Sequence, residues 1–173
     1  LLKQSLVMSN EMIVVTGAKG IIGQSVVNAL SSTGVEVFAV ARDQIDLTRC
    51  GDLTEHVPQK PDGVVHLAAA VPHSPLYPDT KSSAEMTVAI DQTVFEAVNR
   101  WECRVVYAST CSLYDKKNSD IKYEDTPIQV HESSPYMQAK SIGEKLFSAF
   151  SSSAIIRLPA PIGPGLPDTV VAK

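Results

Sequence analysis

The sequence predicts an α/β fold, a doubly wound parallel sheet with helices on both faces. Short apolar runs alternate with segments of helical periodicity along the 173-residue chain. The runs are continuously apolar, as are strands that a parallel sheet buries on both faces. A glycine triplet joins the first run to the first helical segment. Strands that alternate with helices favour right-handed crossovers and therefore this class of sheet.

The composition indicates one globular domain. The chain has 44% hydrophobic and 20% charged residues and a formal net charge of −4, which offers no basic face for nucleic acid. Cys50, Cys103 and Cys111 follow no metal-ligand spacing, so we expect no metal site and a reduced, cytoplasmic setting. Residues 1–10 are expected to be an N-terminal extension, too short to cross a membrane. Residues 11–160 are expected to form the sheet domain.

A strand is expected over Glu11–Thr16, and Gly17, Gly20 and Gly23 follow it at intervals of three residues. The first glycine allows a tight turn, the second lets backbone approach a pyrophosphate, and the third lets the helix lie close to the strand. The N–H groups of the helix's first turn then face the anion. This strand–turn–helix context predicts a dinucleotide site rather than a structural turn. Its candidate cofactor residues are Gly17, Lys19, Gly20, Ile21 and Ile22.

The end of the second strand decides between two cofactors. We expect that strand over Val35–Ala41, after a helix that ends at Gly34. Its carboxyl end points at the adenosine ribose, where an acidic residue favours NAD and an arginine accommodates the 2′-phosphate of NADP. Arg42 therefore favours NADP, while Asp43 beside it leaves NAD open. The alternative role of Arg42 is that of a solvated loop cation.

The later elements place more candidates at strand ends. We expect strands over Gly63–Leu67, Arg104–Ala108 and Ala154–Leu158, a helix from Pro135 to about Phe150, and loops over 71–83 and 115–133. Small residues after the first of these strands leave room for backbone to lie against a flat ligand, although a tightly packed junction is the alternative. The candidate cofactor contacts there are Leu67, Ala68 and Ala69.

A helix expected over Ala84–Arg100 carries more apolar residues than one face holds. One row comprises Met86, Ile90, Val94 and Ala97, and a second comprises Val88, Phe95 and Val98. The sheet buries only one row fully, and an exposed apolar row of that size is uncommon on a monomer. We therefore expect a second subunit to cover the other row, with the 115–133 loop as the alternative cover.

Tyr136 and Lys140 lie four residues apart on one expected helix and project from the same face. A tyrosine near pKa 10 is a poor base at neutral pH. A neighbouring ammonium favours the phenolate, so we expect Lys140 to lower the pKa of Tyr136. Both residues follow the strand that ends at Ser109 and Thr110, and the carboxyl ends of such strands converge on one crevice.

These features together resemble the extended short-chain dehydrogenase/reductase family, also called the NAD-dependent epimerase/dehydratase family. The similar stretches, in order, are TGAKGIIG (16–23), PDGVVHLAA (61–69), YASTCSLY (107–114), SPYMQAK (134–140) and IRLPAPIGPG (156–165). The resemblance implies a Rossmann domain that binds NAD or NADP over residues 11–160. It also implies that residues 161–173 begin a C-terminal substrate domain that is largely absent.

By this resemblance, Tyr136 is the catalytic acid/base, and Lys140 holds the nicotinamide ribose and lowers the pKa of Tyr136. Thr110 is the hydroxyl that binds the reacting sugar oxygen, with Ser109 as the alternative and Ser112 as a further substrate contact. The segment from Arg42 to Leu47 is similar to the reductase branch, which usually takes NADP. The family's helix pair forms a four-helix bundle with a symmetry mate, which implies a homodimer.

Departures from the family narrow the activity. Dehydratases carry Asp-Glu after the threonine, where this chain has Cys111 and Ser112, so water elimination is disfavoured. Cys111 is displaced by one residue from the fucose-synthase cysteine and is expected to be a buried thiol. His66, His73 and His131 have no ligand spacing and are interpreted as ordinary strand and loop residues.

The function expected first is a nucleotide-sugar epimerase that works through a transient keto intermediate. An NADPH-dependent reductase of a sugar-nucleotide or related carbonyl is the alternative within the same class. A non-catalytic NAD(P)-binding sensor is the alternative of another class, motivated by the missing substrate domain. The tyrosine–lysine pair argues against the sensor, which has no chemical reason to keep it.

Overall fold

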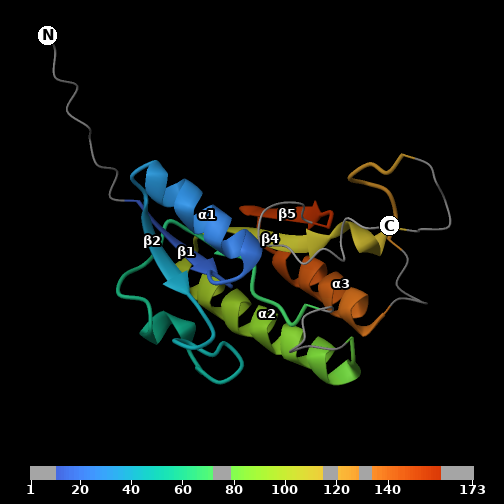
Figure 1. Ribbon diagram of the computed structural model, residues 1–173, viewed down its shortest axis with the longest axis horizontal. Helices are drawn as coiled ribbons and strands as arrows, with labels where there is room; N and C mark the ends of the chain where they lie inside the picture. Colours follow the sequence, from blue (N-terminus) through green and yellow to red (C-terminus); the bar gives the residue numbers. More distant parts are fainter. Residues whose placement is uncertain (1–10, 72–78, 115–120, 129–133, 161–173) are drawn as a thin grey trace, which may run out of the picture.

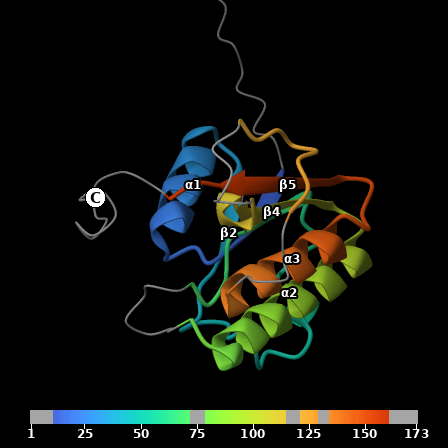
Figure 2. The same cartoon turned by 90° about the vertical axis from the view of Figure 1, so that its right-hand side faces the viewer.

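The computed structural model describes residues 11–71, 79–114, 121–128 and 134–160. They form a five-stranded parallel sheet in the order β2-β1-β3-β4-β5. Helix α1 covers one face, and α2 and α3 lie side by side on the other, as Figure 1 and Figure 2 show. The predicted doubly wound α/β fold is therefore confirmed. The expected extension 1–10, His73, His131 and the segment 161–173 lie outside the described residues.

The observed bounds are close to those expected from the sequence. The strands are β1 (Met12–Thr16), β2 (Glu36–Val40), β3 (Gly63–His66), β4 (Arg104–Thr110) and β5 (Ser153–Leu158). The helices are α1 (Ile21–Ser32), α2 (Lys81–Trp101) and α3 (Pro135–Phe147), with short 3₁₀ turns η1 (Leu53–Glu55) and η2 (Cys111–Leu113). The main differences are a longer α2, a β4 that continues to Thr110, and an α3 that ends three residues early.

Side-chain caps explain where the two long helices begin. Thr80 accepts a hydrogen bond from the Ser83 N–H, and the Ser83 hydroxyl accepts one from the Thr80 N–H. This reciprocal capping box starts α2 at Lys81, inside the expected loop. Ser134 caps α3 in the same way by accepting from the Met137 N–H, and Pro135 occupies the first helical position. The cap therefore fixes Tyr136 in the first turn of α3.

The strand register brings the carboxyl ends of the central strands together. Thr16 of β1 pairs with His66 of β3, and His66 pairs with Tyr107 of β4. β4 runs three residues further, to Thr110. Because all five strands are parallel, the glycine turn, the segment after β3 and the end of β4 meet at one edge of the sheet.

The face of α2 that the protein buries is not one of the two apolar rows expected from the sequence. Its buried residues are Ser83, Thr87, Asp91, Val94, Ala97, Val98 and Trp101. This stripe is apolar in its second half and polar in its first half. Met86, Val88 and Ile90 remain only half-buried. The expectation of one fully buried apolar row is therefore wrong, because polar residues that serve a hydrogen-bond network take the inner positions.

The described helices include none that is both long and apolar enough to span a membrane.

Candidate active site

The glycine turn packs directly against the segment that follows β3. Gly17 has a φ of +68°, and a Cβ added there would lie 2.9 Å from the Ala68 nitrogen. A Cβ on Gly23 would lie 2.1 Å from the Gly17 carbonyl oxygen, so only glycine lets α1 approach the turn this closely. The turn and the Leu67–Ala68 backbone therefore form one continuous surface. The strand-turn-helix arrangement predicted from the glycine spacing is present.

The first turn of α1 has the features of an anion site. Gly20 is the N-cap of α1 and, having no side chain, makes no capping hydrogen bond. The N–H groups of a helix's first residues have no intrahelical partner, so those of Ile21 and Ile22 face outward from the turn. The Ile21 side chain is 45% exposed beside them. A pyrophosphate fits this turn because any N-cap side chain would compete with it for the same N–H groups.

Charged residues at the end of β2 interact with one another across the turn. Lys19 of the turn forms an ion pair with Asp43, which holds the pKa of the Asp43 carboxyl below its ordinary value. Arg42 lies beside Asp46, with 3.9 Å between the guanidinium Nε and the nearer carboxylate oxygen. Both pairs are largely exposed and next to the glycine turn. Asp43 is therefore engaged by Lys19 and Arg42 by Asp46, and both lie just after β2.

The two hydroxyls at the end of β4 have different surroundings. Ser109 is 5% exposed and donates to Glu144 Oε1 at 2.5 Å. Thr110, the next residue, is half-buried and accepts from the Ser112 N–H at 3.2 Å. Ser109 is thus held by Glu144, Thr110 remains the predicted hydroxyl with Ser109 as its alternative, and Ser112 contributes its backbone to the turn.

Glu144 holds Ser109 as part of a buried ion pair. Arg157 of β5 donates to both Glu144 oxygens, from Nε at 2.9 Å and from Nη2 at 2.8 Å. Burial alone would raise the pKa of Glu144, but the hydrogen bonds from Arg157 and Ser109 outweigh it and hold the pKa below its ordinary value. The pair thereby fastens α3 to β4 and β5 behind the site.

Tyr136 and Lys140 lie in the first two turns of α3, and the Lys140 side chain reaches β4. The Tyr136 N–H donates to Asp79 Oδ1 at 3.0 Å, which joins the start of α3 to the segment before α2. Lys140 is 3% exposed and donates to the Ala108 carbonyl at 2.8 Å and to the Tyr107 hydroxyl at 3.3 Å. Lys140 is therefore held at β4, whereas Tyr136 is anchored through its backbone to the segment before α2.

The pKa of Tyr136 departs from the sequence-based expectation in direction. Burial raises the pKa of Tyr136 to about 12, and the negative charges of Asp91 and Asp79 act in the same sense. The expected lowering by Lys140 is therefore wrong for the chain as it stands. Burial also lowers the pKa of the Lys140 ammonium, against the opposing charges of Asp91 and Glu144. Tyr136 thus carries its proton at neutral pH.

Sequence reasoning missed a buried polar network behind this pair. His66 was interpreted as an ordinary strand residue, yet it bonds Thr16 through Nδ1 at 2.7 Å and Asp91 through Nε2 at 3.0 Å. The Tyr107 hydroxyl donates to the other Asp91 oxygen at 2.8 Å. These four side chains are at most 1% exposed. The recurrence of Thr87, Asp91, Val94 and Val98 on one helical face was the signal available in the sequence.

The cysteines and acidic groups offer no metal centre within the described part of the chain, where no three His, Cys, Asp or Glu side chains gather. Cys103 is buried, which raises the pKa of its thiol to about 11. Cys111 was expected to be a buried thiol but is exposed, because it begins the η2 turn at the surface end of β4. Cys50 lies in between.

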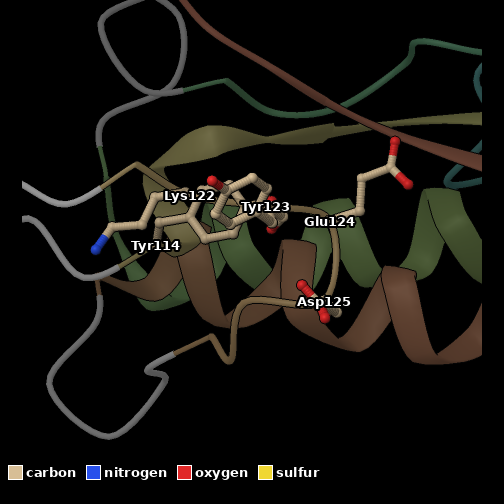
Figure 3. Close-up of a pocket in the computed structure, with 5 residues that line it drawn as sticks. All are labelled: Tyr114, Lys122, Tyr123, Glu124 and Asp125. Atoms are coloured by element: carbon tan, nitrogen blue, oxygen red, sulfur yellow. The ribbon is translucent and has the colours of Figure 1, made fainter.

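A hollow of about 550 Å³ lies beyond η2, beside the same end of the sheet. It is lined by Tyr114, Lys122, Tyr123, Glu124 and Asp125 (Figure 3). Arg157 Nη1 donates to the Tyr114 hydroxyl at 2.9 Å, and its guanidinium lies 4.9 Å from the Tyr114 ring centre. The Tyr114 hydroxyl donates in turn to the Tyr123 carbonyl at 3.1 Å. The buried ion pair behind the site therefore also holds one wall of this hollow.

Comparison with known families identifies this arrangement. A profile of the NAD dependent epimerase/dehydratase family matches residues 13–173. The chain therefore belongs to the NAD-dependent epimerase/dehydratase family, whose members bind NAD or NADP, as the sequence resemblance predicted. No curated protein matches the chain.

Solved structures share the fold. A dTDP-4-dehydrorhamnose reductase of Bacillus anthracis in complex with NADP is 17% identical, with a TM-score of 0.72 over 87% of this chain and 54% of that one. A UDP-galactose 4-epimerase is 26% identical, with a TM-score of 0.68 over 84% and 55%. A short-chain dehydrogenase/reductase superfamily protein of Agrobacterium tumefaciens with bound NAD is 24% identical, with a TM-score of 0.63 over 85% and 48%. The chain spans about half the length of these structures.

Proposed function

We propose that this chain carries the cofactor site and the catalytic side chains of an NAD(P)-dependent enzyme that interconverts a carbonyl and an alcohol on a nucleotide-sugar. One observation carries the proposal: Lys140 of the Tyr-x-x-x-Lys pair donates a hydrogen bond to the Ala108 carbonyl of β4, two residues before Thr110. The glycine turn lies at the same edge of the sheet. A cofactor turn and an acid–base pair thus serve one crevice.

The turn and the strand ends would hold the cofactor. The uncapped first turn of α1 would bind the pyrophosphate, and Leu67, Ala68 and Ala69 would line one side of the bound dinucleotide. Arg42 would meet a 2′-phosphate, which favours NADP over NAD because Asp43 is already paired with Lys19. The nicotinamide would supply or accept a hydride.

The protein's own side chains would handle the proton. Tyr136, protonated at neutral pH because burial raises its pKa to about 12, would donate its proton to a carbonyl oxygen that is being reduced. Thr110 would donate a hydrogen bond to that oxygen, and Lys140 would bind the nicotinamide ribose and keep a positive charge beside the site. A carboxylic acid next to Thr110, which water elimination needs, is replaced by Cys111.

Two outcomes of this chemistry remain candidates. Carbonyl reduction needs Tyr136 protonated, its form at neutral pH, and the position of Arg42 after β2 suits NADPH, so an NADPH-dependent reductase is one candidate. The likeness to UDP-galactose 4-epimerase, at 26% identity, favours an epimerase that oxidises a sugar carbon and reduces it again. For the epimerase, Tyr136 must lose its proton in the oxidising half-reaction, so binding of substrate and cofactor must lower its pKa.

A reaction with deuterated cofactor separates these outcomes. The full-length protein is incubated with a panel of UDP-, GDP- and dTDP-sugars, in one arm with NADPH deuterated at C4 and in a second arm with NAD⁺ or NADP⁺, which the oxidising half-reaction of an epimerase needs. The reductase consumes NADPH stoichiometrically and transfers the label to its product. The epimerase produces a stereoisomer with no net consumption of cofactor. Tight cofactor binding with neither reaction supports the non-catalytic sensor and contradicts the proposed enzyme.

A homodimer through α2 and α3 also belongs to this proposal. Met86, Val88 and Ile90 of α2 are half-buried, and Ile142 of α3 is 49% exposed on the same side of the sheet. A two-fold partner would cover these apolar side chains.

A further inference from the structure

We propose that Asp91 is a positioning residue that joins the two halves of the candidate active site. Through Tyr107 it orients the Lys140 ammonium, and through His66 and Thr16 it holds the Leu67–Ala68 backbone. That these two halves form an active site rests on the proposed function. The network itself is defined by hydrogen bonds within the chain. Asp91 itself lies in α2 and is 1% exposed.

Donor and acceptor can be assigned consistently for every hydrogen bond in the network. An ionised Asp91 only accepts, so Tyr107 donates its hydroxyl proton to Oδ2 and His66 donates from Nε2 to Oδ1. His66 Nδ1 is then the acceptor for the Thr16 hydroxyl. The Thr16 oxygen in turn accepts from the N–H groups of Leu67 and Ala68, both at 3.2 Å.

The other end of the network is equally determined. The Tyr107 hydroxyl donates its hydrogen bond to Asp91, so its oxygen is free to accept one from the Lys140 ammonium, at 3.3 Å. Lys140 also donates to the Ala108 carbonyl, so two fixed acceptors aim its charge. A single carboxylate therefore sets the orientation of a side chain on α3 and of backbone after β3.

Burial makes this arrangement depend on charge balance. The described groups that act on Lys140 are Asp91 of α2, Glu144 of α3, the Tyr107 hydroxyl of β4 and His66 of β3. Glu144 is already paired with Arg157. His66 stays neutral, because burial lowers its pKa and its Nδ1 accepts a hydrogen bond from the Thr16 hydroxyl. Of the two carboxylates in this set, Asp91 is the one that is not paired with an arginine. We infer that its negative charge balances the positive charge of Lys140.

The sequence keeps the space that the network needs. A Cβ on Gly143 would lie 2.0 Å from the Tyr107 hydroxyl oxygen and 2.4 Å from Asp91 Oδ2. Gly143 lies in the middle of α3, where glycine weakens a helix. The close approach of α3 to the Asp91–Tyr107 hydrogen bond is the structural reason for a glycine at this position.

Two variants break the network in different ways. In Asp91→Asn, the amide keeps an acceptor for His66 but presents N–H to Tyr107, so the hydroxyl receives two donors and loses its own acceptor. Tyr107→Phe keeps the Asp91 charge and the ring that stacks on Phe147 at 4.7 Å, but removes the hydroxyl that joins Asp91 to Lys140. Glu96→Gln is the matched control, since Glu96 is an exposed carboxylate on the same helix that accepts a hydrogen bond from Gln92, away from the network.

The test follows the Lys140 ammonium and the Ala68 amide directly. Lysine labelled with ¹³C at Cε gives the titration midpoint of Lys140 by NMR, with Lys140→Met to assign the resonance. We expect Asp91→Asn to lower that midpoint by about one unit or more, because an opposite charge about 4–6 Å away has this effect. Tyr107→Phe should lower it too, and Glu96→Gln should leave it unchanged. Amide exchange at Ala68 should quicken about tenfold in Asp91→Asn.

Binding of NADP and NAD to the same variants distinguishes a failure of the positioning role of Asp91 from a failure of the proposed function. A lowered midpoint and faster exchange in a protein that binds neither nucleotide support the network and contradict the proposed function. Wild-type values in Asp91→Asn and Tyr107→Phe, in a protein that does bind cofactor, overturn the positioning role of Asp91 alone. If Asp91→Asn does not fold, the titration midpoint of Lys140 in Tyr107→Phe is the test: a lowered midpoint supports the positioning role, and a wild-type midpoint overturns it.

Discussion

Replacement of Gly143 by alanine tests how tightly α3 packs against the buried network. The added methyl group would lie 2.0 Å from the Tyr107 hydroxyl oxygen and 2.4 Å from Asp91 Oδ2, which no real contact tolerates. The methyl group overlaps both oxygens, so we expect α3 to move outward and the Tyr107–Asp91 hydrogen bond to break, and the two costs add. Overpacking of this kind costs about 1–3 kcal/mol, and loss of a buried hydrogen bond to a charged group costs about 1.5–3 kcal/mol.

The opposing gain is small. Alanine is about 1 kcal/mol more favourable than glycine within a helix, so we expect a net decrease of about 2–4 kcal/mol in the free energy of unfolding. Urea denaturation followed by circular dichroism measures it. Gly34→Ala is the control, because its Cβ meets nothing within 4 Å and only its φ of +84° is unfavourable, at about 1–2 kcal/mol. A Gly143→Ala protein as stable as wild type would refute the packing argument.

Three further predictions concern the cofactor, a buried thiol and association. Arg42→Ala should weaken NADP about tenfold or more relative to NAD, since one charge-assisted hydrogen bond is worth about 1.5–3 kcal/mol; equal losses in titration calorimetry would make Arg42 structural. Burial raises the pKa of Cys103 from 9.0 to about 11, so the folded state keeps a proton that the unfolded state releases. The free energy of unfolding should then fall by about 2 kcal/mol between pH 9 and 11, and Cys103→Ala should remove that loss in urea titrations. Sedimentation at micromolar concentration should show a dimer, and a clean monomer would contradict the α2–α3 bundle.

The features that the sequence predicted correctly depend on residues that are close together in the chain. The glycine turn could be predicted because Gly17 and Gly23 are required by backbone geometry within ten residues of β1. The strands could be predicted because a parallel sheet buries continuous apolar runs. The start of α2 was missed by three residues, because the capping box of Thr80 and Ser83 lies in a segment whose prolines indicated a loop.

The features that it did not predict depend on residues distant in the chain. Asp91, His66 and Tyr107 lie on three different elements, and only the fold brings them together. The periodicity of α2 was judged from its apolar residues, so a face that includes a buried carboxylate was not recognised. The pKa of Tyr136 was judged from Lys140 alone, whereas burial determines its direction.

Tyr136→Phe tests the central claim most directly. The full-length variant and the wild type are compared for NADPH binding by calorimetry and for turnover with the nucleotide-sugar that the wild type accepts. Because phenylalanine keeps the ring and loses only the proton that the reaction needs, we predict cofactor affinity within about twofold of wild type and a loss of turnover of about 10²–10⁴-fold. Unchanged turnover in this variant would contradict the assignment of Tyr136 as the acid–base group.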